Sequence, residues 1–132
     1  MIDDEKKLND LLSRILSLEG FNVLQAYTAK QGLSMLHQED IVLVISDVKL
    51  PDANGVELVK AIKQIKPGGI LFTFSCSQVI DRYTFNSTIM AAAIEAGKNV
   101  RVLHHLSQPP DHPVNIFHPE GEYLKGLVLY IE

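Results

Sequence analysis

Three carboxylates lie just past two short apolar segments of this chain. Asp3 and Asp4 follow the first two residues, and Asp47 follows the apolar run 41–45. If those segments are neighbouring strands, the carboxylates converge, and their mutual repulsion favours a hard divalent cation such as Mg²⁺. With a metal in place, Asp47 could attack a phosphoryl group as a nucleophile. The alternative is that Asp3 or Asp4 caps a helix and Asp47 begins a loop.

A second candidate is Cys76, the single cysteine of the chain, which lies between Ser75 and Ser77 after another apolar run. At a helix amino terminus its thiol would have a lowered pKa and could act as a nucleophile. The alternative is a half-buried small residue, since the sequence identifies no basic neighbour. Four histidines fit no standard metal-ligand spacing and are interpreted as loop and edge residues: His104, His105, His112 and His118.

These residues need a scaffold of alternating strands and helices. Helices are predicted from apolar residues at helical spacing and from their end signals, a capping box at Thr28–Gln31 and stops at Gly20 and Gly97. The predicted helices cover 8–16, 29–36, 56–62 and 79–96, and the predicted strands cover 21–27, 41–46, 70–74, 100–106 and 123–131.

This order predicts an α/β fold for residues 1–132 as one domain. We expect a three-layer sandwich with helices on both faces of a mostly parallel sheet, of a flavodoxin-like or Rossmann-like kind. The last strand follows its predecessor without a helix, so it should run antiparallel beside it. Met1 and Ile2 could add a short central strand. If they leave that place open, strand exchange between copies of the chain could form a homo-oligomer.

Composition excludes several classes of function. The chain of 132 residues has 12 Lys and Arg against 16 Asp and Glu, a net charge of −4 that disfavours nucleic-acid binding. No segment approaches the roughly 18 apolar residues of a membrane span, and no signal peptide opens the chain. One cysteine excludes a disulfide framework. These features predict a cytoplasmic protein without a membrane partner.

Two stretches carry a family resemblance: residues 2–7 (IDDEKK) and residues 45–58 (ISDVKLPDANGVEL). Together they resemble the response regulator receiver domain of two-component signalling, from residue 1 to about Lys66. The resemblance implies that Asp47 is the phosphoacceptor and that a histidine kinase or a small phosphodonor supplies the phosphoryl group. It also implies that Mg²⁺ is bound by Asp4, Asp47 and the backbone carbonyl of Lys49, with Asp3 acting through water.

The chain departs from the receiver pattern in three respects. Only Met1 and Ile2 stand where a receiver has a full first strand, and the strand at 100–103 is followed by His104 and His105 instead of a phosphoryl-contacting lysine. Lys125 falls inside a different predicted strand. Thr73 or Ser75 could take the place of the hydroxyl residue that ends the receiver's fourth strand, but the residues around them do not match the receiver.

A second resemblance is carried by residues 66–77 (KPGGILFTFSCS), 91–97 (AAAIEAG), 111–113 (DHP) and 119–126 (PEGEYLKG). They are similar to the carboxyl-terminal part of S-adenosylmethionine (SAM)-dependent methyltransferases, closest to those that modify cytosine C5 in large-subunit ribosomal RNA. That resemblance implies that Cys76 holds the nucleophile position. No Gly-x-Gly loop between a strand and a helix occurs in residues 1–67, so SAM binding and methyl transfer are not expected.

We therefore interpret the chain as a chimera, and we expect it to be an engineered one. A receiver-like segment (1–66) is joined near Lys63–Pro67 to a methyltransferase-like segment (67–132). The chain is expected not to be an enzyme and to keep only a remnant of a phosphorelay site. The alternatives are a working receiver phosphorylated on Asp47, and an RNA methyltransferase fragment that lacks its SAM site.

Overall fold

A computed structural model describes residues 1–47 and 56–132. Within those residues, four strands form one sheet in the order β1-β2-β4-β3. The strands are β1 (Leu43–Asp47), β2 (Ile70–Ser75), β3 (Val100–Leu106) and β4 (Lys125–Ile131). The helices are α1 (Lys6–Leu18), α2 (Ala29–Gln38), α3 (Val56–Gln64), α4 (Arg82–Ala96) and the short 3₁₀ helix η1 (Pro119–Gly121).

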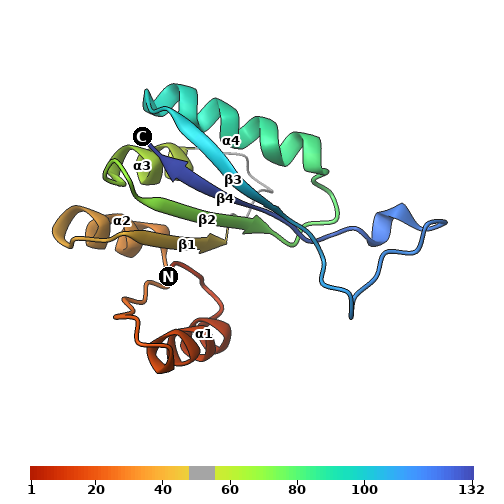
Figure 1. Ribbon diagram of the computed structural model, residues 1–132, viewed down its shortest axis with the longest axis horizontal. Coiled ribbons are helices and arrows are strands. Elements are labelled where there is room, and N and C mark those ends of the chain that lie inside the picture. Colours follow the sequence, from red (N-terminus) through yellow and green to blue (C-terminus); the bar gives the residue numbers. More distant parts are fainter. Residues whose placement is uncertain (48–55) are drawn as a thin grey trace.

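The sheet combines one parallel and two antiparallel pairings. β1 runs parallel to β2, and β4 runs antiparallel to both β2 and β3, so β1, β2 and β3 share one direction (Figure 1). The predicted α/β class and the antiparallel last strand are confirmed. β4 also lies between β2 and β3. Because β4 runs antiparallel to β2, its first residue lies at the edge of the sheet where β1 and β2 end.

The helix end signals act as the sequence predicts. Thr28 Oγ1 accepts a hydrogen bond from the amide of Gln31 (3.2 Å), and Gln31 Oε1 accepts one from the amide of Tyr27 (3.0 Å). Gly97 closes α4 in the left-handed conformation, with φ of 67°. α4 begins at Arg82 instead of the predicted residue 79, because Asp81 is its cap.

The core lies between the sheet and the layer formed by α2, α3 and α4. Along β2 the side chains of Leu71, Thr73 and Ser75 are buried, while the alternate residues Ile70, Phe72 and Phe74 are only half-buried. Successive strand residues face opposite sides, so one face of the sheet is covered more completely. α1 lies beside the β1 end of the sheet, away from β3 and β4 (Figure 1). Further core residues are Val44, Ile62, Ile65, Phe85, Ile89, Leu127, Leu129 and Ile131.

The predicted strand at 21–27 is wrong. In the described residues only Ala26 of that segment forms a bridge, and its partner is Ile2. Ile2 also bridges Ser46, so the first residues form a short parallel strand between this segment and β1. Among the residues that the structure describes, the backbone of 21–27 bonds in strand fashion to residues 1–3 alone, and a ladder of that length cannot order all of 21–27 as a strand.

α1 forms where its apolar periodicity predicts, but its orientation differs from a simple core helix. The polar residues Asn9 and Ser13 are buried, while Leu8, Leu11 and Ile15 of the apolar stripe are exposed. The reason is a set of hydrogen bonds from Asn9, described below. Among the described residues, none of the helices has the length and apolar character needed to cross a lipid bilayer.

Candidate functional site

Asp3 and Asp47 lie side by side at the edge where β1 ends. Ile2 donates its amide to the carbonyl of Ile45 (2.8 Å), and Asp47 donates its amide to the carbonyl of Ile2 (3.3 Å). In this parallel register Ile2 pairs with Ser46, so the next residues, Asp3 and Asp47, are neighbours. Asp3 is only 6% exposed, and its Oδ1 accepts the amide of Glu5 (2.8 Å). Two carboxylates so placed repel each other unless a cation lies between them.

The donor set at this edge fits Mg²⁺ in its chemistry. Asp3, the exposed residue Asp4 and Asp47 provide hard oxygen donors, and Mg²⁺ commonly binds through one or two carboxylates while waters and phosphate oxygens complete its shell. The described part of the chain has no preformed group of three or more His, Cys, Asp or Glu side chains that could hold a metal. The predicted carbonyl ligand of Lys49 lies outside the described residues.

Asn9 fixes the position of Asp3. Its Nδ2 donates to the carbonyls of Asp3 (3.0 Å) and Ala26 (2.9 Å), and its Oδ1 accepts from Nε2 of Gln25 (3.2 Å). The Asn9 side chain is fully buried. The sequence does not indicate this role of Asn9, because an asparagine on the polar side of an amphipathic helix is normally solvated.

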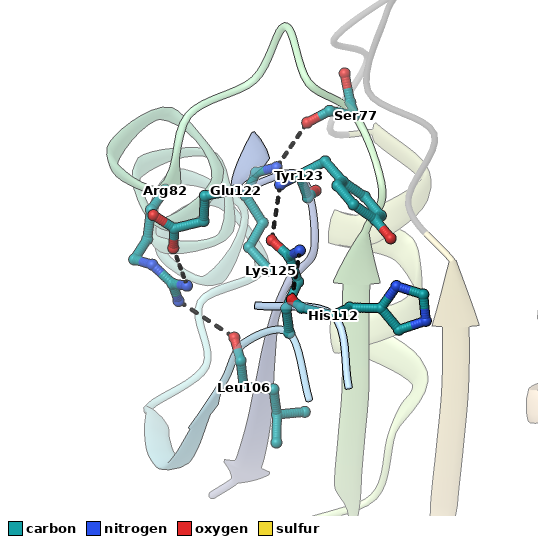
Figure 2. Close-up of polar contacts among 8 residues, drawn as sticks. Ser77, Arg82, Leu106, His112, Glu122, Tyr123 and Lys125 are labelled. Carbon is teal, nitrogen blue, oxygen red and sulfur yellow. Dashed lines mark hydrogen bonds and ion pairs between the residues drawn. The ribbon is translucent and has the colours of Figure 1, made fainter. Parts of the chain in front are cut away.

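Lys125 lies at the same edge of the sheet, because β4 runs antiparallel to β2. It is the first residue of β4 and pairs with Ser75, the last residue of β2. Its side chain is only 3% exposed, and Nζ donates to the carbonyls of Ser77 (2.7 Å) and Tyr123 (2.9 Å) (Figure 2). Burial, followed by the charge of Arg82, lowers the pKa of this ammonium group. Lys125 was predicted to lie inside a strand, and its position at this edge was not expected from the sequence.

An ion pair braces the chain around Lys125. Arg82, at the start of α4, donates from Nη2 to Oε1 of Glu122 (2.7 Å) and from Nη1 to the carbonyl of Leu106 (3.2 Å) (Figure 2). Gln108 Oε1 accepts the amide of Tyr123 (3.1 Å). These contacts join the end of β3, the entry to β4 and the start of α4.

Two buried hydroxyl groups lie on β2 close to Lys125. Ser75 is 1% exposed, and its Oγ accepts the amide of Ser77 (3.3 Å). Thr73 is fully buried, and its Oγ1 has no hydrogen-bond partner within the described residues. Both were candidates for the receiver's hydroxyl residue, and Ser75 is the one that lies opposite Lys125.

Cys76 adjoins these charges but is not activated by them. Burial, then the charge of Asp47 and to a smaller extent that of Asp3, raise the pKa of its thiol, while Lys125 acts in the opposite direction. The helix amino terminus considered as an activating group is not at hand, because α4 begins at Arg82. Asp81 satisfies that end through its Oδ1, which accepts the amide of Thr84 (2.7 Å).

The histidines do not converge. His104 and His105 are exposed on β3, and His112 and His118 are exposed in the loop that follows. His118 Nδ1 lies 3.0 Å from Oε1 of Glu120. Their interpretation as loop and edge residues agrees with this placement.

Comparison with protein families gives a match to the response regulator receiver domain over residues 1–102. That range extends well beyond Lys66, where the sequence resemblance was expected to end. It includes β1, β2, α4 and the first part of β3.

The carboxyl-terminal half of the chain is similar to a different group of proteins. Ribosomal RNA large subunit methyltransferase I of Pseudoalteromonas atlantica is 48% identical over 68 residues, and that of Aeromonas salmonicida is 44% identical over 69 residues. Each alignment covers 52% of this chain and 17% of the methyltransferase. The chain thus spans a small part of the length of these relatives.

Solved structures show the same fold across nearly the whole chain. A putative SAM-dependent methyltransferase from Streptococcus mutans has a TM-score of 0.73 at 12% identity, covering 98% of this chain and 37% of that protein. A second putative methyltransferase, SMU.776 in complex with SAH, has a TM-score of 0.62 at 13% identity. The receiver-like and methyltransferase-like parts therefore fit one α/β sheet.

Proposed function

The chain belongs to the response regulator receiver family, and from this premise we propose that its function is to accept a phosphoryl group on Asp47. The observation that supports this most directly is the placement of Asp3, Asp47 and Lys125 at one edge of the sheet. An acidic nucleophile and a buried cation at one edge are what phosphoryl transfer to a carboxylate requires.

In the proposed reaction an Oδ atom of Asp47 attacks phosphorus, and the bond between phosphorus and the donor's leaving group breaks. The product is an acyl phosphate on Asp47, and the leaving group departs with the electron pair of the broken bond. Lys125 and the hydroxyl of Ser75 would contact the transferred phosphoryl oxygens. Lys125 would do so by redirecting one of its three N–H groups from the backbone carbonyls that it now contacts.

We propose that Asp4 and Asp47 bind Mg²⁺ directly and that Asp3 acts through water. When bound, the metal neutralises charge on the phosphoryl oxygens during transfer. Asn9 would keep Asp3 beside Asp47 whether or not the metal is present. The phosphoryl donor would be a histidine kinase or a small phosphodonor, and the net charge of −4 disfavours a nucleic acid as partner.

The test is phosphorylation of the purified chain by a small phosphodonor with Mg²⁺, followed by intact mass and by hydroxylamine sensitivity, which is typical of an acyl phosphate. We expect the mass increment of one phosphoryl group for the wild-type chain and none for Asp47→Asn. Asp111→Asn, in the exposed loop, is the matched control and should be phosphorylated normally. An unmodified wild-type chain, or equal modification of Asp47→Asn, would contradict the proposal.

A second candidate is a chimeric fold, of engineered origin, that has no evolved activity. One observation favours it: the ammonium group of Lys125 already donates to two backbone carbonyls. A lysine with a purely structural role would make the same contacts. Beryllofluoride separates the two candidates. Binding should change the NMR signals around Asp47 if the site accepts a phosphoryl group, and should leave them unchanged if the fold has no activity.

We propose that this chain does not transfer methyl groups and does not act as an enzyme. The raised pKa of Cys76 disfavours the thiolate that a nucleophile requires, and the aligned region is 17% of the related methyltransferases. Calorimetry with SAM should therefore give no binding heat. Saturable SAM binding would revive the third alternative, a methyltransferase fragment with Cys76 at the nucleophile position.

A further inference from the structure

The face of the sheet opposite α2, α3 and α4 is apolar but only partly covered. On β1, β2 and β4 its side chains alternate with the core residues, and they are half-buried or exposed. Apart from Asp47 at the end of β1, none of them is charged in the described strands. A sheet face that meets water normally carries polar side chains. We call this surface the open face, and it includes Leu43, Ile45, Phe72, Phe74, Val128 and Tyr130.

The chain crossovers place α1 on this face, at one side of it. The connection from residues 1–3 through α1 to 21–26 leads away from β1, and the connection from β1 through α3 to β2 leads the opposite way. Because such crossovers are right-handed, α1 and α3 lie on opposite faces. Asn9 bonds to the carbonyls of Asp3 and Ala26, so α1 covers residues 1–3 and 21–26. The described helices leave β1, β2 and β4 without a cover on this face (Figure 1).

One side of α1 borders the open face. Asp10 accepts hydrogen bonds from Gln25 Nε2 (2.9 Å) and from the hydroxyl of Tyr27 (2.9 Å), so its side of the helix lies toward the outer segment 21–27. Successive helix residues turn by about 100°, and residues two positions apart therefore lie on nearly opposite sides. Leu8 and Leu12, two positions from Asp10, thus lie on the side toward β1.

A second side of α1 is apolar and points away from its own sheet. Leu11 lies two positions from the buried Asn9, and Ile15 lies two positions from the buried Ser13, so both leucine and isoleucine point outward. They are 55% and 47% exposed. A helix that buries its polar side and exposes its apolar one indicates a surface that contacts another molecule.

We propose that two copies of this chain pack their open faces together as a symmetric dimer, with both α1 helices in one layer between the two sheets. Leu11 and Ile15 of each copy would contact the open face of the other copy. Leu8 and Leu12 would contact the α1 helix of the other copy. Each copy thus uses the same two surfaces, as a two-fold interface requires.

The two apolar surfaces together favour a second copy over a foreign helix. A foreign helix beside α1 could cover the open face, but it would leave Leu11 and Ile15 in water, whereas a second sheet covers them. α1 has 13 residues and is about 20 Å long and about 10 Å wide. Two of its sides, with the strip of sheet that the other helix covers, give roughly 600 Å² per copy, near the roughly 800 Å² that each partner buries in a stable interface.

The test is sedimentation of the full chain over a range of concentrations. We expect a reversible equilibrium between monomer and dimer. Leu11→Glu places a charge in the proposed contact and should raise the dissociation constant at least tenfold, whereas Met90→Glu, at an exposed position of α4, should stay within about threefold of wild type. Both positions are exposed, so both variants should fold, as circular dichroism checks. A wild-type chain that stays monomeric at about 1 mM, or equal effects of the two substitutions, would overturn the proposal.

Nuclear Overhauser effects (NOEs) between copies locate the interface. In a mixture of chains with labelled leucine methyl groups and unlabelled chains, we expect effects between Leu11 of one copy and the aromatic rings of the other copy's open face, Phe72, Phe74 or Tyr130. A dimer whose contacts between copies lie on β3 or α4 instead would overturn the proposal.

The same measurements distinguish the other arrangements. A dimer formed by strand exchange would persist in Leu11→Glu and would lack these effects, which would overturn the proposal. A monomeric chain whose open face binds an apolar dye would show a surface that a second copy does not cover, with the same consequence. Neither experiment uses Mg²⁺ or a phosphodonor, so a failure here is separate from a failure of phosphorylation on Asp47.

Discussion

Lys125 lies directly opposite Ser75 across the β2–β4 ladder, although the two residues are far apart in the sequence. The pairing follows from the direction of β4. A strand parallel to β2 would bring its last residue to this edge, whereas the antiparallel β4 brings its first residue, Lys125. Lys125 thus brings a basic group to the edge where β1 and β2 end. A receiver instead has a lysine there that follows its fifth strand.

The first prediction concerns this lysine. Lys125→Met removes the cation but keeps a long side chain, and it should slow phosphorylation of Asp47 by about 10- to 100-fold, the value of one hydrogen bond to a charged group. The rate is measured by intact mass over time with a small phosphodonor and Mg²⁺. Lys63→Met, on the exposed side of α3, is the control and should react at the wild-type rate.

The same variant separates chemistry from folding. Lys125→Met also leaves the carbonyls of Ser77 and Tyr123 without their donor, which should lower the free energy of unfolding by about 1–3 kcal/mol. If the variant remains folded by circular dichroism and is phosphorylated as fast as the wild type, the role of Lys125 is structural only.

The second prediction tests the charges around Cys76. Asp47 raises the pKa of the thiol and Lys125 lowers it. Asp47→Asn should therefore lower this pKa and speed alkylation of Cys76 at pH 8, while Lys125→Met should raise the pKa and slow it, each by about a factor of two or more. The rate is measured with iodoacetamide, and the urea-unfolded chain provides the unperturbed reference. Equal rates in all three folded chains would mean that Asp47 and Lys125 lie too far from the thiol to affect it.

Local signals made most of the fold predictable from the sequence. The strand at Val100–Leu106, the capping box at Thr28 and the stop at Gly97 appear where the sequence analysis placed them. The strand predicted at 21–27 does not form because a strand needs a partner, and in the described part of the chain that segment has only residues 1–3 as one.

The candidate site was predictable only in its acidic half. Asp3 and Asp47 follow apolar segments, so the sequence indicates their position at an edge. Lys125 and Asn9 required knowledge of tertiary structure: the insertion of β4 between β2 and β3 in one case, and the rotation of α1 in the other. Neither has a signal in local composition or periodicity.

The third prediction concerns Asn9. Asn9→Ala removes the donors to the carbonyls of Asp3 and Ala26 and should lower the free energy of unfolding by about 1–3 kcal/mol. Asn9→Asp should cost more, because it places a carboxylate against two carbonyls and beside Asp3. Urea denaturation measures both, and Lys7→Ala on the exposed side of α1 should change stability by less than about 0.5 kcal/mol. Equal stabilities for the Asn9 and Lys7 variants would contradict the burial of Asn9.

The fourth prediction is that alanine at Gly32 changes the free energy of unfolding in the direction opposite to the usual one for a helical glycine. Alanine in place of a helical glycine normally stabilises by about 0.5–1 kcal/mol, but here its Cβ would come within 2.3 Å of the Ile2 side chain. Gly32→Ala should therefore destabilise the wild-type chain by about 1–3 kcal/mol. In an Ile2→Ala background the same change should become stabilising. A double-mutant cycle in urea gives both values, and additive effects would contradict the packing of Ile2 on α2.

The last prediction compares two glycines that differ in backbone conformation. Gly97 has φ of 67° and Gly121 has no left-handed φ, and an added Cβ at either would meet nothing within 4 Å. Gly97→Ala should therefore cost about 1 kcal/mol through the left-handed conformation alone, and Gly121→Ala should change stability by less than about 0.5 kcal/mol. Gly97→Asn should fall between Gly97→Ala and the wild type, because asparagine tolerates the left-handed region better than alanine does. Urea denaturation measures all three variants, and an unchanged Gly97→Ala would mean that α4 ends without the left-handed cap.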